Sequence, residues 1–302
     1  MIIGVTQENT PKIETIATKL VDSLAGMGSC LIAFSGGVDS SVVAQAAWLA
    51  LGNRSVAITG FGAAVSEVDL HWARVVTQSI GIPHEHIQTQ EISDPNYLRN
   101  DARRCYFCKS HLYSSLRTWA LKNGFQTILS GTNFDDLDDY RPGLEAATEN
   151  SVVAPLANLK IGKATIRELA KYWSLPVAER PASPCLASRI AYGEHVSEER
   201  LQRIETAEAW LHREGFVDVR VRLHADELAR LEIGREDFGR LAEPGFRDAV
   251  NAAFRVMGFR YVTIDLGGRQ SGSLNRSLTN NYASLSNDAN RATLRQALPV
   301  LQ

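Results

Sequence analysis

The segment SGGVDS, at positions 35–40, combines residue types that bind a polyanion. Its glycines let the backbone approach a phosphate closely, and the helical pattern that begins near Ser41 adds N–H groups at a helix N-terminus. It lacks the lysine of a Walker A loop and the G-x-G-x-x-G spacing of a dinucleotide fingerprint. An ordinary strand-to-helix turn with a Ser/Asp cap is the alternative. We interpret the segment as a nucleotide pyrophosphate loop formed by Ser35, Gly36, Gly37 and Ser40.

Asp39 is unusual in such a loop, because a carboxylate beside bound phosphates is repelled unless a divalent cation lies between them. We therefore expect Asp39 to bind Mg²⁺ and to be catalytic. A second polar segment, SGTNFDDLDDYRPG at 130–143, follows another apolar run, and a solvated acidic loop is its alternative reading. The residues expected to complete the ATP–Mg²⁺ site are Gly131, Thr132, Asn133 and Asp136, with Arg141 holding a phosphate or a substrate carboxylate; Asp138 and Asp139 rank lower.

Three of the four cysteines lie in settings that favour metal or redox chemistry. Cys105 and Cys108 form a Cys-x-x-Cys pair in a helical-looking segment, where residues three apart share a face. Cys185 lies in the Pro-rich stretch PASPCLASR. The residues alone leave open a redox pair, a structural zinc site with His111 as a further ligand, an iron–sulfur site with three thiolates, and three unrelated cysteines.

Cationic neighbours surround the Cys-x-x-Cys pair in the sequence. Arg103, Arg104 and Lys109 are expected to favour the thiolate forms. The remaining cysteine, Cys30, begins an apolar run and is predicted to be a buried core residue.

Two arginines alternate with apolar residues in VRVRLH, at positions 219–224. On a strand, Arg220 and Arg222 would project from one face. Adjacent guanidiniums repel each other unless an anion lies over them, so the pair predicts an anion site. The alternative is a solvent-exposed edge on which acids such as Glu208 or Glu232 neutralise the arginines.

The first half of the chain alternates strand-like and helix-like segments, as an open parallel α/β sheet requires. A helix is expected to open at Thr10, and buried strands are expected at 31–34, 56–60 and 127–130. Ligands of such sheets collect beyond the carboxyl ends of the strands, where both polar loops fall. From about residue 198 we expect a smaller α+β domain with a helix to 214, strands at 217–224, 228–233 and 261–266, and a helix at 237–256.

Composition sets outer limits on function. The 302 residues, 44% hydrophobic and 22% charged, are enough for one large or two modest domains. The net charge of −2 argues against a nucleic-acid partner. No apolar run approaches the ~20 residues of a membrane span, and the segment MIIGVTQENT does not resemble a signal peptide. We expect a soluble, cytoplasmic protein.

The SGGVDS loop resembles that of the N-type ATP pyrophosphatase superfamily, whose members activate an oxygen as an adenylate. A closer resemblance covers almost the whole chain. SGGVDS, GTNFDDLDDYRPG, PCLASRIAYG (184–193), VRVRLH and DLGGRQSGSLN (265–275) resemble, in this order, the sulfur transferases that build the nickel-pincer nucleotide cofactor of lactate racemase. The resemblance implies an adenine nucleotide α-hydrolase-like domain at 1–150, a connecting segment at 151–195 and an α+β domain for sulfur transfer and substrate binding at 196–302.

The resemblance also implies a reaction. ATP adenylates a carboxylate of pyridinium-3,5-biscarboxylic acid mononucleotide, pyrophosphate and AMP are released, and the carboxylate becomes a thiocarboxylate. The resemblance assigns the substrate to Arg141, Ser188, Arg189, Arg220 and Arg222, with Glu208 and Glu232. Relatives of this type suggest a homo-oligomer.

Two sulfur sources occur in the resembled family. In one branch a single cysteine gives up its own sulfur; in the other, three cysteines hold a 4Fe-4S cluster that carries an additional sulfide. Pro184 occupies the position of the sacrificial cysteine, which favours a cluster held by Cys105, Cys108 and Cys185. Cys185 as a consumed donor stays an alternative, and so do a tRNA thiolase, an amide-forming synthetase and a nucleotide-binding scaffold with zinc. The physiological sulfide donor is not indicated.

Overall fold

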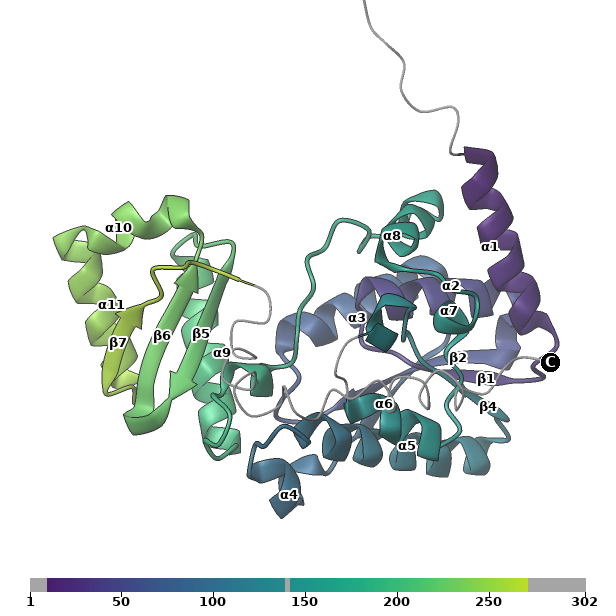
Figure 1. Ribbon diagram of the computed structural model, residues 1–302, viewed down its shortest axis with the longest axis horizontal. Helices are drawn as coiled ribbons and strands as arrows, with labels where there is room; N and C mark the ends of the chain where they lie inside the picture. The colour runs from purple at the N-terminus through teal and green to yellow at the C-terminus, as the bar shows by residue number, and fades with distance from the viewer. Residues whose placement is uncertain (1–9, 139–141, 271–302) are drawn as a thin grey trace, which may run out of the picture.

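The computed structural model describes residues 10–138 and 142–270, without the side chains of Thr10, Pro11 and Asp138. Its elements form a larger group around one sheet and a smaller group around a second sheet (Figure 1). None of the helices within these two ranges has the length and apolar character needed to span a bilayer.

The larger sheet is parallel and has the strand order β3-β2-β1-β4. Its strands are β1 (Cys30–Ala33), β2 (Ser55–Phe61), β3 (His84–Gln88) and β4 (Thr127–Leu129). The expected open parallel sheet is confirmed, and the three predicted strands are present with boundaries shifted by one residue at most ends. β3 was not predicted, because the edge strand HEHIQ carries polar side chains and is only partly buried.

Helices cover both faces of this sheet (Figure 1). They are α1 (Thr10–Ala25), α2 (Val38–Leu51), α3 (Glu67–Ile80), α4 (Pro95–Leu98), α5 (Arg104–Asn123), α6 (Pro142–Glu149), α7 (Pro155–Asn158) and α8 (Lys163–Tyr172). α2 is apolar around most of its circumference because it packs against α1, α3 and α8 as well as against the sheet. α5 and α6 pack together on the opposite face, over a separate cluster of buried residues.

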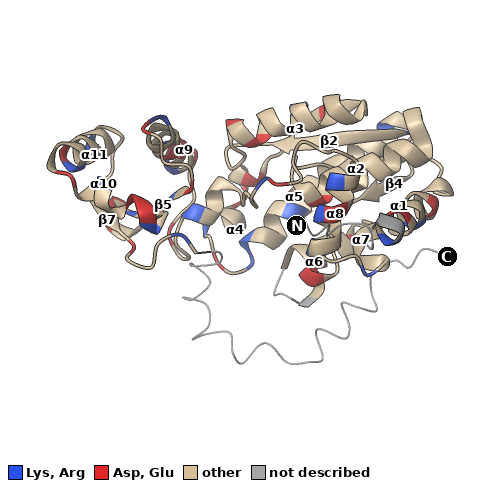
Figure 2. Ribbon diagram, turned by 90° about the horizontal axis from the view of Figure 1, so that it is seen from above, with Lys and Arg blue, Asp and Glu red and all other residues tan. Residues whose placement is uncertain are grey.

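The smaller group is an α+β unit, as expected. It contains α9 (Glu198–Arg213), β5 (Val219–His224), β6 (Leu228–Ile233), α10 (Phe238–Ala242), α11 (Pro244–Val256) and β7 (Tyr261–Ile264). β5 pairs antiparallel with β6, β7 pairs parallel with β6, and the helices lie along one face of the sheet (Figure 2). The single helix predicted at 237–256 is wrong, because the chain leaves the helical conformation at Glu243 and Pro244 begins a new helix.

Residues 173–197 connect the two groups and contact both. The backbone N–H of Leu186 donates to the Ala64 carbonyl, which lies beyond the carboxyl end of β2, at 2.9 Å. Ile190 forms an isolated bridge to Leu223 of β5. Ala64 and Leu186 also share a hydrophobic core with α9 and β5. The domain boundaries at 150 and 195 stay predictions.

Candidate active site

The SGGVDS loop follows β1 and leads directly into α2. The helix begins at Val38, so the predicted start near Ser41 was three residues late and Asp39 lies in the first turn. Gly37 is the N-cap and makes no side-chain cap bond, unlike the capped turn considered as the alternative. Gly37 therefore offers the N–H groups of the first turn no capping side chain, and a helix N-terminus of this kind is a common phosphate-binding site.

The loop is shaped by close packing. Gly36 has a φ of 72°, and a Cβ at this position would lie 2.8 Å from the backbone nitrogen of Ala73 in α3. The hydroxyls of Ser35 and Ser40 lie 3.2 Å apart across the loop. The Gly37 N–H donates to the Ser35 hydroxyl at 3.3 Å. These contacts fix a turn that an L-side chain at position 36 would disrupt.

The second polar loop meets the first one, as the sequence predicted. A Cβ on Gly131 would lie 2.7 Å from the Ser40 nitrogen, so the end of β4 touches the start of α2. Asn133 Nδ2 donates to Asp39 Oδ1 at 3.0 Å. Asn133 and Asp136 are joined by reciprocal backbone-to-side-chain hydrogen bonds of 3.3 and 3.1 Å. The remaining predicted member, Thr132, accepts a hydrogen bond from the Ser130 hydroxyl at 3.1 Å.

The carboxylates of Asp39 and Asp136 are close enough to repel each other. Burial raises the pKa of Asp39, the Asn133 hydrogen bond opposes this, and the negative charge of Asp136 raises the pKa further. Lys163 lies 3.4 Å from Asp136 Oδ1 and offsets part of the charge. No group of three His, Cys, Asp or Glu side chains within residues 10–138 and 142–270 forms a metal site. One carboxylate together with phosphate oxygens and water is the usual arrangement of a nucleotide-bound Mg²⁺, and Asp39 could supply that carboxylate.

Some predicted members of this loop cannot be placed. Arg141 and Asp139 lie outside the described residues, as does the side chain of Asp138. The last five residues of the motif DLGGRQSGSLN, at 271–275, are also outside.

The three cysteines come from two segments that meet. Cys105 and Cys108 lie in the first turns of α5, and Cys185 directly precedes the short 3-10 helix Leu186–Arg189. All three are free thiols, and Cys105 and Cys185 are exposed. Burial raises the pKa of Cys108 to about 12, and negative charge on Cys185 and Cys105 raises it as well. The expectation that cationic neighbours favour a thiolate is thus wrong for Cys108, because desolvation outweighs the attraction of Lys109.

The other candidates near the cysteines have different partners. His111 Nε2 lies 3.0 Å from Asp94 Oδ2, so the histidine considered as a zinc ligand is engaged by a carboxylate. Cys30 is fully buried, as predicted, and burial raises its pKa to about 11. Two polar residues near the cysteines were missed: Tyr97 Oη and Glu91 Oε2 are buried, and neither has a hydrogen-bond partner among the described residues. Burial raises the pKa of Tyr97, and negative charge on Cys185 and then on Cys108 raises it further. Tyr97 belongs to the hydrophobic cluster against which Cys108 packs.

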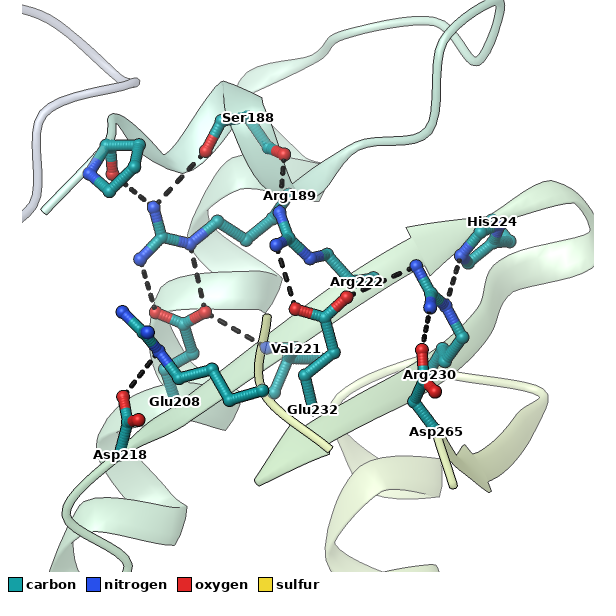
Figure 3. Close-up of polar contacts among 12 residues, drawn as sticks. Ser188, Arg189, Glu208, Asp218, Val221, Arg222, His224, Arg230, Glu232 and Asp265 are labelled. Atoms are coloured by element: carbon teal, nitrogen blue, oxygen red, sulfur yellow. Dashed lines mark hydrogen bonds and ion pairs between the residues drawn. The ribbon is translucent and has the colours of Figure 1, made fainter. Parts of the chain in front are cut away.

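The Cys185 segment is held by its own Arg189 and by Arg222 of β5 (Figure 3). Arg189 Nη1 donates to the carbonyl oxygens of Pro184 and, at 3.1 Å, of Cys185. Arg222 Nη1 donates to the Ser188 carbonyl at 2.9 Å. Two guanidiniums thus hold the backbone on both sides of the cysteine.

The acids beside these arginines are buried under them. Glu208 accepts from Arg189 Nε at 3.1 Å and from the Val221 N–H at 3.0 Å. Glu232 is fully buried and lies 2.8 Å from Arg222 Nη2 (Figure 3). The pairing matches the alternative reading, but the solvent-exposed edge does not, because Arg222 is only 3% exposed. Both carboxylates orient the arginines, and their contact with substrate stays a prediction.

Arg220 differs from its neighbours on β5. Its side chain is 5% exposed and has no hydrogen-bond or ion-pair partner among the described residues. Burial lowers its pKa to about 10, the positive charges of Arg269, Arg189 and Arg222 lower it further, and the negative charge of Glu232, opposite it on β6, opposes the shift. A buried guanidinium among three other arginines is the electrostatic pattern of an anion-binding site. Arg269 was missed, although its motif DLGGRQ was recognised.

Comparison with known proteins agrees with this geometry. A family model described as NAD synthase matches residues 12–120. An uncharacterized protein of Synechocystis sp. is 45% identical over 82% of this chain and 92% of its own length. The pyridinium-3,5-bisthiocarboxylic acid mononucleotide synthase of Lactiplantibacillus plantarum is 34% identical over 88% of this chain and 96% of its own. An uncharacterized protein of Methanocaldococcus jannaschii is 30% identical over 78% and 88%.

The parallel sheet and the SGGVDS loop define an ATP pyrophosphatase-type nucleotide-binding protein. Within that class, the chain belongs to the same family as the Lactiplantibacillus plantarum synthase. The resemblance inferred from the five motifs is confirmed.

Proposed function

We propose that this chain is an ATP-dependent sulfur transferase that adenylates a carboxylate of pyridinium-3,5-biscarboxylic acid mononucleotide and converts it to a thiocarboxylate. Its relative from Lactiplantibacillus plantarum carries the name of a synthase for the corresponding bisthiocarboxylic acid. The observation that carries the proposal is the setting of Cys185, whose flanking backbone is held by Arg189 and Arg222 at the edge of a buried arginine cluster.

The adenylation step uses the loop at the carboxyl end of the sheet. The N–H groups at the start of α2 receive the pyrophosphate, and Asp39 with a nucleotide-bound Mg²⁺ orients the α-phosphate. A carboxylate oxygen of the substrate attacks the α-phosphorus, and pyrophosphate leaves with the electron pair of the broken P–O bond. Asn133 holds Asp39 in place through its 3.0 Å hydrogen bond. The product of this step is an acyl adenylate.

The substrate is a mononucleotide, so it carries a phosphate that needs a cationic site. Arg220 suits this role because it is buried, forms no ion pair among the described residues and lies among other arginines, although Glu232 stands opposite it on β6. Arg222 already forms an ion pair with Glu232 and donates a hydrogen bond to the Ser188 carbonyl. We assign the phosphate chiefly to Arg220, with Arg222 and Arg189 fixing the surrounding backbone.

Sulfur delivery is assigned to the cysteines. Cys105, Cys108 and Cys185 are free thiols within electrostatic range of one another. Three thiols are the donor set that would hold a 4Fe-4S cluster. Such a cluster, when bound, supplies an iron with an open position for an additional sulfide. In the second step a sulfur nucleophile adds to the activated carbonyl and AMP leaves.

The test is a single-turnover assay on anaerobically purified, iron-reconstituted protein with ATP, Mg²⁺, sulfide and the biscarboxylic acid mononucleotide. We expect AMP and a thiocarboxylate product by mass spectrometry, and a large loss of product in Arg220→Ala. Arg213, exposed on α9, provides the matched control Arg213→Ala. Absence of AMP would refute the proposal. A chain lighter by the mass of H₂S would identify Cys185 as the consumed sulfur donor instead.

A further inference from the structure

The segment that carries Cys185 and the helix that carries Cys105 and Cys108 are far apart in sequence, so something must hold them together. The described contacts between them converge on Asn100 and Arg104, which lie just before and at the start of α5. Neither residue has been given a part in the reaction above. Asn100 is fully buried and Arg104 is 5% exposed, so both polar side chains need internal partners.

Asn100 binds a turn of the connecting segment. Its Nδ2 donates to the carbonyl oxygens of Ala191 at 2.8 Å and Glu194 at 2.9 Å, with a longer contact of 3.4 Å to Ile190. Its own carbonyl accepts from the Gly193 N–H at 3.1 Å. Asn100 has a φ of 54°, a left-handed conformation that asparagine tolerates better than most residues. Its backbone and side chain are therefore both shaped for this turn.

Arg104 connects that turn to the cysteine segment. Its Nη1 donates to Asn100 Oδ1 at 2.5 Å and to the Ala187 carbonyl at 2.8 Å. Ala187 lies two residues after Cys185, and the Ser188 N–H donates back to the Cys185 carbonyl at 2.9 Å. Arg104 itself directly precedes Cys105. One guanidinium nitrogen thus bridges the backbones on which two of the cysteines lie.

Two simpler roles for Arg104 fit less well. If it acted only as a positive charge beside the thiols, it would not need a planar donor aimed at two neutral oxygens. If Arg104 only stabilised the core, it would not need to donate to the Ala187 carbonyl, two residues after Cys185. Asn100 supports neither simpler role, since it is uncharged and binds only backbone groups and Arg104.

We propose that Asn100 and Arg104 are positioning residues that hold Cys185 beside Cys105 and Cys108. The inference rests on the proposed role of the three cysteines in sulfur delivery. The proposal concerns only how close the three thiols lie to one another in the folded chain. Its test therefore needs no metal, ATP or substrate, and its outcome does not depend on whether the proposed reaction is correct.

The test uses dibromobimane, a short cross-linker that becomes fluorescent when both arms have reacted with thiols. The full chain carrying Cys108→Ser reports the Cys105–Cys185 pair, and the full chain carrying Cys185→Ser reports the Cys105–Cys108 pair within α5; peptide mass spectrometry identifies each cross-link. Into each background we introduce Arg104→Ala, Arg104→Lys and Asn100→Asp. Asn100→Asp keeps the acceptor for Arg104 and loses the donor to the turn. Arg99→Ala is the matched control, since Arg99 is exposed and contacts Asn96 on its own helix.

We expect each of the three variants to slow cross-linking of Cys105 to Cys185 roughly tenfold, the order expected for the loss of an internal hydrogen bond between the two segments. Cross-linking of Cys105 to Cys108 and the thermal shift produced by ATP–Mg²⁺ should stay at the wild-type level. Wild-type behaviour of Arg104→Lys would overturn the proposal in favour of a charge effect. Equal loss of both cross-links would overturn it in favour of a general role in folding, and an unchanged Cys105–Cys185 cross-link in all variants would also overturn it.

Discussion

Replacing Arg220 with methionine should stabilise the fold and weaken anion binding at the same time. Methionine keeps an unbranched apolar stem and removes a buried charge that forms no ion pair among the described residues and for which burial and three neighbouring arginines outweigh the attraction of Glu232. Most substitutions of a buried residue destabilise, so the sign of this effect is the distinctive part of the prediction.

The magnitude follows from the electrostatics of the site. Lowering the pKa of Arg220 to about 10 corresponds to about 3 kcal/mol of unfavourable free energy for the charged form, which is present at every pH below that value. Solvent screening and the lost packing of the guanidinium reduce the gain, and we expect about 1–2 kcal/mol. Arg222→Met should have the opposite sign, with a loss of about 1.5–3 kcal/mol, because it removes one partner of the buried Glu232 carboxylate, which keeps Arg230 at 3.3 Å.

The assay is urea unfolding followed by tryptophan fluorescence, to which Trp210 on α9 contributes the signal of the smaller group. It is run with and without inorganic phosphate. Phosphate at about 100 times its dissociation constant should stabilise the wild type by about 2.7 kcal/mol and should leave Arg220→Met unchanged. Arg213→Met controls for the loss of a positive charge on the surface. A destabilised Arg220→Met variant, or one that phosphate stabilises as much as the wild type, would refute the electrostatic reasoning.

Three further predictions concern the larger group. Gly131→Ala should cost about 1–3 kcal/mol and abolish the thermal shift produced by ATP–Mg²⁺, because the new Cβ would meet the Ser40 nitrogen at 2.7 Å; a normal ATP shift would contradict the contact between the loops. Asp39→Asn should remove AMP formation while thermal stability is kept or raised, since burial already disfavours the charged carboxylate and raises its pKa; AMP formation near the wild-type rate would exclude the role given to Asp39. Burial lowers the pKa of His84 to about 4, whereas the pKa in the unfolded chain is near 6.5. Above pH 6.5 the buried neutral histidine costs nothing, and as the pH falls from 6.5 through 4 the fold should lose on the order of 1–2 kcal/mol of stability, because only the unfolded chain takes up the proton. His84→Gln should flatten that part of the pH–stability curve in urea titrations, and an unchanged slope would assign acid sensitivity to other groups.

The architecture could be predicted where the signal is local. The strands at β1, β2 and β4 are short apolar runs that end in glycine or polar residues, and such runs specify buried parallel strands by themselves. β3 escaped prediction because an edge strand does not need an apolar face on both sides, so HEHIQ has no distinctive pattern. The break between α10 and α11 could have been found from Pro244, which favours the first turn of a helix over its interior.

The candidate site was predictable to a different extent in its two halves. SGGVDS and the Asn133 loop carry their chemistry in consecutive residues, and the parallel sheet brings the ends of β1 and β4 together. The arginine site depends on which charges become neighbours after folding. The sequence shows Arg220 and Arg222 as equivalent, whereas the structure pairs Arg222 with Glu232 and leaves Arg220 without such a partner among the described residues.

The sequence by itself determined the class of nucleotide loop, the parallel sheet that presents it and the set of cysteines available for sulfur chemistry. These properties depend on residue type and short spacing. Tertiary structure alone decided that burial raises the pKa of Cys108 despite its cationic neighbours. It alone gave Arg104 and Asn100 their hydrogen bonds to the Cys185 segment. Desolvation and hydrogen bonding between distant segments depend on how the chain packs, and no local pattern specifies them.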